Sequence, residues 1–182
     1  MMIDPLTGLD EDLVFGAEHR GRARSSSRLE VEAGLIATSC AAMEPVFYDK
    51  DERFFSEVHF TVPHLVHPVQ GYTSVDFILE VPKRYPQEAP RIYPVRPTLP
   101  FDHRSHLYVD ELDNNRTHIC VWAEGEWTTN HSLAGAMIWA AIWINKYAVF
   151  KHEGTWPGPE RPHCPKCGAL LVNGCDHHPL EG

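Results

Sequence analysis

Five cysteines give this chain of 182 residues its clearest capacity for chemistry, and Cys120 stands apart from the others. It lies between apolar neighbours in Ile119-Cys120-Val121, downstream of a proline-rich turn at residues 85–90. A cysteine thiolate attacks carbonyl carbon readily and also leaves readily, so a displayed cysteine suits the transfer of acyl groups. The alternative is that Cys120 is a small core residue, as free cysteines often are.

Three more cysteines lie near the C-terminus in a pattern typical of zinc ligands. Cys164 and Cys167 form a Cys-x-x-Cys-Gly sequence, whose two-residue spacer lets both thiolates reach one ion. The predicted ligands are Cys164, Cys167, Cys175 and His177, with His163 or His178 as substitutes for the histidine. We expect structural zinc here, because a short tail needs such a cross-link to stay folded. A tail without structure, in which the cysteines occur by chance, is the alternative.

The first half of the chain predicts a helix followed by an antiparallel sheet. Ser27 is a candidate N-cap for a helix over residues 28–42, where apolar residues recur at helical spacing. Three β-like runs follow at residues 46–48, 55–62 and 73–81. The last two alternate between apolar and polar residues, and turn residues separate the runs, which predicts a meander.

The second half predicts a flap, an irregular loop and a long helix. Six prolines within residues 82–100 exclude a long helix or a central strand and leave room for one short edge strand at Ile92-Tyr93. Residues 102–117 are polar and rich in histidine, and we expect them to be irregular. A helix begins near Ser132, is apolar on nearly all sides and ends at Gly154. The order of elements indicates an α+β fold.

The composition and charge of the chain indicate its domain boundaries and exclude some classes of partner. We expect a flexible arm at residues 1–26, one domain at 27–160 and the zinc-binding tail at 161–182. A formal net charge of −9 argues against a nucleic-acid-binding surface. No apolar run of about 18–20 residues suggests a membrane span, and the N-terminus lacks the pattern of a secretory signal. The cysteine pattern suits a reducing compartment, so we expect a cytoplasmic protein without nucleic-acid or membrane partners.

Together, these motifs resemble the ubiquitin-conjugating enzyme (E2) family over about residues 28–160. The segments that carry the resemblance are Tyr85-Pro86-Gln87-Glu88-Ala89-Pro90, Ile119-Cys120-Val121 and Trp127, in that order. Trp139, Trp143, Tyr147 and the segment 153–158 are similar to bacterial E2-like proteins of antiphage-defence and ubiquitin-like conjugation operons. The resemblance implies an E2 (UBC-like) fold with an N-terminal helix, a meander, a proline-rich flap, an active-site loop and a C-terminal helix.

The resemblance also implies a reaction. Cys120 would accept a ubiquitin-like protein as a thioester from an E1-like activating enzyme and pass it to an amine of a protein target in bacterial antiviral defence. His106 or His118 would relay the proton of the incoming amine, and Asn114 would stabilise the oxyanion, with Asn115 or Ser105 as alternatives.

One departure from the family pattern affects this assignment. E2 enzymes carry His-Pro-Asn before the cysteine, whereas this chain has His103-Arg104-Ser105-His106-Leu107-Tyr108 and an apparent insertion at residues 111–115. The oxyanion role therefore transfers to no single residue. A non-catalytic E2-variant-like domain that binds a ubiquitin-like protein or a peptide is the alternative function. The spacing of histidines and cysteines within the main domain does not support a zinc hydrolase.

Overall fold

A computed structural model describes residues 28–49, 55–110, 116–122 and 125–158. Several expectations fall outside these ranges: the N-terminal arm, Ser27, Asn114, Asn115, and the zinc ligands Cys164, Cys167, Cys175 and His177. Within the described ranges the chain is α+β, with two antiparallel sheets and two α-helices.

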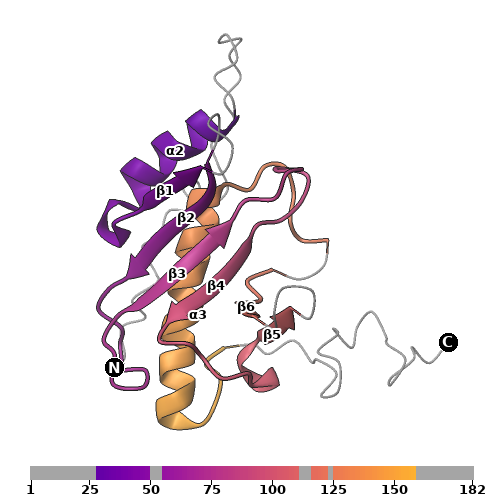
Figure 1. Cartoon of the computed structure of the whole chain (residues 1–182). Coiled ribbons are helices and arrows are strands. Elements are labelled where there is room, and N and C mark those ends of the chain that lie inside the picture. The colour runs from indigo at the N-terminus through magenta and orange to yellow at the C-terminus, as the bar shows by residue number, and fades with distance from the viewer. Residues whose placement is uncertain (1–27, 50–54, 111–115, 123–124, 159–182) are drawn as a thin grey trace, which may run out of the picture.

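A four-stranded antiparallel sheet forms the centre of the fold, with the strand order β1-β2-β3-β4 (Figure 1). The strands are β1 (Val46–Asp49), β2 (Phe55–Val62), β3 (Val75–Glu80) and β4 (Arg91–Arg96). The register of β2 and β3 sets buried apolar residues opposite each other: Val58 and Leu79, Phe60 and Phe77, Val62 and Val75. Alternation therefore puts one face of the sheet into the core, and the predicted meander is confirmed.

Strand β4 is longer than the two-residue strand that the prolines suggested. It includes Pro94, which lies opposite Phe77 of β3. Proline has no backbone N–H to donate to a neighbouring strand. Because β4 is the last strand of its sheet, one of its sides needs no hydrogen-bond partner within that sheet. An edge position therefore tolerates Pro94 and lets the strand extend.

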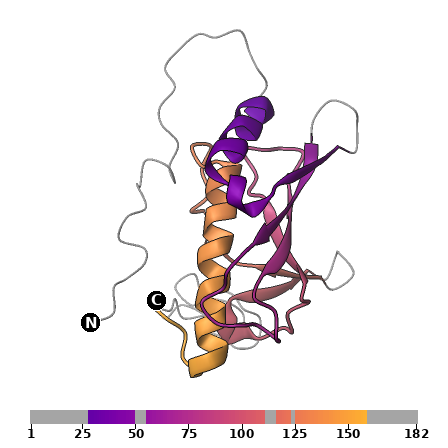
Figure 2. The ribbon, with the colours of Figure 1, turned by 90° about the vertical axis from the view of Figure 1, so that its left-hand side faces the viewer.

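Helix α3 (Leu133–Glu153) covers the apolar face of the sheet, and α2 (Arg28–Ser39) packs near its start (Figures 1 and 2). The Ser132 hydroxyl oxygen accepts a hydrogen bond from the Gly135 backbone N–H at 3.0 Å, and Gly154 ends the helix with a φ of 79°. The sequence predicted a helix that begins near Ser132 and ends at Gly154, and the structure shows Ser132 as its N-cap and Gly154 as its left-handed C-cap. By length and apolar composition α3 could also span a membrane, yet most of its apolar stretch is buried here, as in the core helix of a globular domain.

A buried carboxylate joins α2, the flap and the start of α3. The Glu32 side chain is fully buried and accepts hydrogen bonds from the Arg28 Nε at 2.8 Å and the Tyr85 hydroxyl at 2.6 Å. Its second oxygen accepts the backbone N–H of Leu133, the first residue of α3, at 2.8 Å. Glu32 thus satisfies a helix N–H that has no partner within the helix, and its charge suits that end of the helix dipole.

The histidine-rich segment before Cys120 is more regular than expected. It forms a short 3₁₀ turn at His103–Ser105 and then an antiparallel hairpin of β5 (Leu107–Asp110) and β6 (Arg116–Ile119). The expectation of an irregular loop was wrong, because strands of four residues are too short to show clear alternation. Strand β6 packs against β4 of the main sheet, so the hairpin fixes the position of Cys120, the residue that directly follows β6.

Candidate active site

Cys120 is displayed at the end of β6 rather than buried within the core. Its backbone N–H donates to the carbonyl oxygen of His106 at 2.9 Å, which ties it to the start of β5. The side chain is partly exposed, and its Sγ lies 3.1 Å from the carbonyl oxygen of Trp122, to which the thiol donates. This placement contradicts the alternative that Cys120 is a fully buried core residue.

Cys40, in contrast to Cys120, is a buried structural cysteine. Its side chain is 1% exposed, and its Sγ lies 3.7 Å from the carbonyl oxygen of Ala134 in α3. Burial raises the pKa of the Cys40 thiol to about 11. Because the thiolate is the nucleophilic form, Cys40 is unsuited to chemistry at neutral pH.

Tyr108 lies beside Cys120, although no sequence motif indicated it as a site residue. It lies in β5 opposite His118 of β6, and its hydroxyl is hydrogen-bonded to the side chain of Cys120. Burial, the nearby Cys120 charge and this hydrogen bond raise the pKa of Tyr108 well above its usual value. The hydroxyl therefore stays protonated at physiological pH and acts as a donor toward the sulfur.

The histidines near Cys120 have different surroundings. The His118 ring stacks on Tyr108 with their centroids 5.8 Å apart, and the Tyr93 ring meets its edge at 6.1 Å. His118 thus belongs to the same cluster as Tyr108 and Cys120. The His106 ring lies 4.9 Å from Trp156, which follows α3, and its backbone carbonyl holds Cys120. A proton-relay role for either ring stays a prediction.

Ser105 is a poor oxyanion donor in this arrangement. Its side chain is fully buried, and its hydroxyl donates to the carbonyl oxygen of Asp102 at 2.7 Å. A hydroxyl that closes a local turn in this way would have to break that bond to reach a reacting carbonyl. The contact favours Tyr108 over Ser105 as the polar group beside the cysteine.

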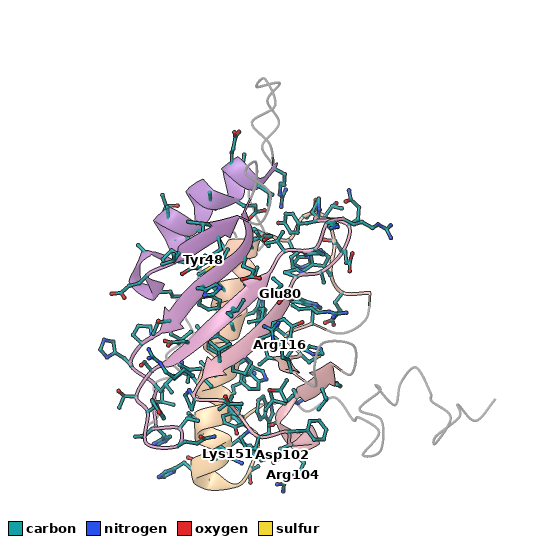
Figure 3. All side chains as sticks on the ribbon, viewed as in Figure 1. Tyr48, Glu80, Asp102, Arg104, Arg116 and Lys151 are labelled. Carbon is teal, nitrogen blue, oxygen red and sulfur yellow. The ribbon has the colours of Figure 1, made fainter. Side chains whose placement is uncertain are left out.

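An ion pair and a ring contact fasten the hairpin to the main sheet. Arg116 of β6 donates to the Glu80 carboxylate of β3 at 2.7 Å (Figure 3). The Arg116 guanidinium also lies 3.7 Å from the centre of the Tyr93 ring in β4. These contacts fasten β6 to β3 and β4, and so help to fix the strand that leads to Cys120.

Trp127 connects the flap to the segment that follows Cys120. Its indole N–H donates to the carbonyl oxygen of Pro86 at 2.8 Å, and its ring packs 4.8 Å from Trp122 and 6.2 Å from Tyr85. The Tyr85-Pro86 turn and the Trp122 carbonyl that accepts the Cys120 thiol are therefore held by one aromatic cluster. This cluster therefore lies beside Cys120.

A model of the Type II CBASS E2 protein family matches residues 53–164 of this chain. The matched range includes the flap, the β5–β6 hairpin, Cys120 and α3, together with Cys164 but not the other three predicted zinc ligands. No curated protein and no solved structure matched the chain.

Proposed function

Because this chain belongs to the type II CBASS E2 protein family, an E2-like family of bacterial antiphage defence, we propose that it forms a thioester on Cys120. Its acyl donor would be a ubiquitin-like protein carried by an E1-like activating enzyme, and its acceptor an amine of a protein target. The observation that carries this proposal is a partly exposed thiol with a protonated hydroxyl hydrogen-bonded to it.

Two acyl transfers make up the proposed reaction. In the first, the Cys120 thiolate attacks the carbonyl carbon of the incoming thioester, a new S–C bond forms, and the thiolate of the activating enzyme leaves. In the second, the target amine attacks the same carbon, a C–N bond forms, the amine loses a proton, and the Cys120 thiolate leaves. Each step passes through a tetrahedral intermediate that carries negative charge on oxygen.

We propose that Tyr108 supplies the polar donor that E2 enzymes place in His-Pro-Asn. It is the third residue of His106-Leu107-Tyr108, at the position that Asn occupies in the family tripeptide. Its hydroxyl stabilises the Cys120 thiolate before acylation, because a donor to a charged group favours the charged form. Once the sulfur is acylated, the same hydroxyl would be free to donate to the developing oxyanion. Asn114 remains a second candidate for that role.

His118 is the better placed of the two histidines to accept the proton of the incoming amine. It packs against Tyr108, whereas the His106 ring packs against Trp156. We propose His118 as the base and His106 as the residue whose carbonyl orients the backbone of Cys120. Separate substitutions His118→Gln and His106→Gln test this division, because only the first should slow transfer to the amine while leaving thioester formation unchanged.

The order of α2, meander, flap, hairpin and α3 supports the further proposal that the fold is UBC-like. We also propose that the tail holds structural zinc through Cys164, Cys167, Cys175 and His177, and that the protein acts in the cytoplasm. The cysteine spacing supports the zinc site. Zinc content of the intact protein tests it: Cys164→Ser/Cys167→Ser should lower the zinc content by one ion per chain.

The decisive experiment for the function is a thioester assay. The protein is incubated with the cognate E1-like enzyme, the ubiquitin-like protein and ATP, and products are separated with and without reductant. We expect an adduct that reductant removes, that Cys120→Ala abolishes and that Cys120→Ser converts to a reductant-stable ester. Cys40→Ala is the matched control and should keep the adduct. Binding of the ubiquitin-like protein without any adduct would favour the non-catalytic binding domain instead.

A further inference from the structure

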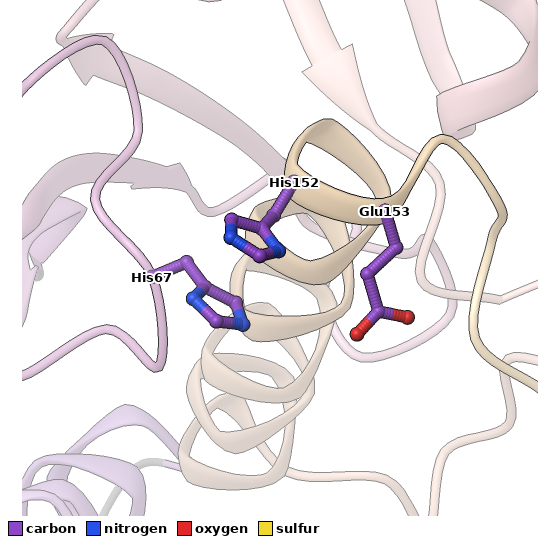
Figure 4. Close-up of side chains that lie close together, drawn as sticks. All are labelled: His67, His152 and Glu153. Carbon is purple, nitrogen blue, oxygen red and sulfur yellow. The ribbon is translucent and has the colours of Figure 1, made fainter.

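We propose that His67, His152 and Glu153 form a binding site for a divalent transition-metal ion of the Zn²⁺ class, outside the Cys120 site. His67 lies in the connection between β2 and β3, and the other two are the last residues of α3. One ligand atom from each side chain lies within 4.8 Å of the other two. Figure 4 shows the two imidazole rings face to face, with the Glu153 carboxylate beside them.

The side chains lie near one another but are not in the geometry of a formed site. Ligand atoms bonded to a tetrahedral zinc at about 2.0–2.1 Å lie roughly 3.3 Å from one another. The ring centroids of His67 and His152 are 4.1 Å apart with an interplanar angle of 2°. An ion between the ring edges would need the rings to turn out of this parallel stack. His152 and Glu153 are exposed and His67 is partly exposed, so these side chains have room to rotate toward a common ion.

A hydrogen bond already joins the β2–β3 connection to α3, about two helical turns before His152. The Val66 N–H, next to His67, donates to the Asn145 side-chain oxygen of α3 at 3.0 Å. The position of His67 against α3 therefore does not have to be created by the ion, which lowers the entropy cost of binding.

The local charge favours a cation. The last turn of α3 presents carbonyl groups without helical partners and the negative end of the helix dipole, and Glu153 adds a carboxylate. Lys151 lies in the same turn, but its ammonium group is over the Tyr147 and Phe150 rings, 5.6 and 5.8 Å from their centres.

The donor set indicates the kind of ion. Two imidazoles with one carboxylate suit Zn²⁺, Co²⁺, Ni²⁺ or Cu²⁺, whereas Mg²⁺ and Ca²⁺ prefer oxygen ligands. Three protein ligands leave a fourth position for water or an added ligand. A bound ion would link the β2–β3 connection to the end of α3. It would raise the unfolding temperature by an amount that grows with the logarithm of the free ion concentration once this exceeds the dissociation constant.

Calorimetric titration of the full-length protein with Zn²⁺ tests the site. A background with Cys164→Ser, Cys167→Ser and Cys175→Ser removes the thiolates of the proposed tail site. In that background we expect one ion per chain, with affinity lowered by about 10- to 100-fold in His67→Ala and in Glu153→Gln, since even outer partners of metal ligands have effects of this size. His64→Asn, an exposed histidine of the same connection with a φ of 55°, is the matched control and should bind as the background does.

Nuclear magnetic resonance identifies the ligands directly. Added Zn²⁺ should shift the imidazole nitrogen resonances of His67 and His152 and leave those of His64 in place. Thermal unfolding in a chelator shows whether each variant is folded, and it should match the background. The proposal is overturned if the background binds no Zn²⁺, or if it binds Zn²⁺ equally well after His67→Ala with both imidazole signals unmoved.

Discussion

The Tyr108 hydroxyl of β5 is hydrogen-bonded to the Cys120 side chain that follows β6. Two short strands must pair in one register for this contact to exist, with Tyr108 opposite His118. The relationship places a protonated donor beside the proposed nucleophile. We propose that Tyr108 thereby replaces the polar donor of the family tripeptide His-Pro-Asn, which this chain lacks.

Tyr108→Phe should therefore slow thioester formation while preserving the fold. The phenylalanine ring keeps the packing on His118 and removes only the hydroxyl. Loss of one donor to a developing oxyanion costs about 10²- to 10³-fold in rate in other enzymes, and we expect a loss of that order in single-turnover assays. Tyr72→Phe, an exposed tyrosine of the β2–β3 connection, is the control and should be fully active. Equal rates for both variants would remove Tyr108 from the mechanism.

The same substitution should change the ionisation of the thiol. A hydrogen bond to a charged group contributes about 1.5–3 kcal/mol, so its loss should move the midpoint of Cys120 alkylation to higher pH by about one to two units. The pH dependence of iodoacetamide labelling at Cys120, followed by peptide mass mapping, measures this directly. An unchanged midpoint would mean that Tyr108 acts on the oxyanion alone.

Alkylation should also separate the two described cysteines in the native protein. Cys40 is buried and its pKa is raised to about 11, whereas Cys120 is partly exposed. We expect labelling of Cys120 within minutes at neutral pH and no labelling of Cys40 until denaturant is added. Rapid native labelling of Cys40 would show that α2 opens easily from α3.

The parts of this molecule that follow local rules could be predicted from the sequence. Strands β2 and β3 show alternation over six residues or more, and α3 has a serine cap, an apolar surface and a terminal glycine. The β5–β6 hairpin has none of these signals, because each strand has four residues. The contact between Tyr108 and Cys120 depends on cross-strand register, which no local pattern of residues specifies. Cys120 was therefore predictable as a candidate, and its partner was not.

Glu32→Ala should destabilise the domain severely. The substitution leaves the Tyr85 hydroxyl, the Arg28 side chain and the Leu133 N–H without the carboxylate that they share. Removing one member of a buried charged network costs about 3–5 kcal/mol, which urea unfolding followed by circular dichroism can measure. Glu30→Ala, in the same turn but exposed, should change the free energy of unfolding by about 1 kcal/mol or less.

Three tyrosines should make the protein sensitive to alkali. Burial raises the pKa of Tyr85, of Tyr108 and of Tyr147, the last to about 12. Above pH about 10 the unfolded chain loses these phenolic protons before the folded chain does, so the unfolded state binds fewer protons and stability falls as pH rises. Below that pH the contribution is fully present. Urea unfolding at a series of alkaline pH values measures the loss of stability, and tyrosinate absorbance measures the ionisation of the tyrosines. We expect both changes over the same pH range.

Tyr147→Phe should reduce this alkaline sensitivity without a cost at neutral pH. The Tyr147 ring is fully buried and stacks on Trp143, while its hydroxyl has no hydrogen-bond partner among the described residues. Removing a buried hydroxyl that makes no hydrogen bond is neutral or stabilising, so the free energy of unfolding near pH 7 should stay equal or rise by about 1 kcal/mol. Above pH about 10 the variant should lose stability less steeply than the parent, because one fewer raised pKa contributes to the slope. A variant that is less stable at neutral pH would reveal that the hydroxyl has a partner, such as an ordered water, in solution.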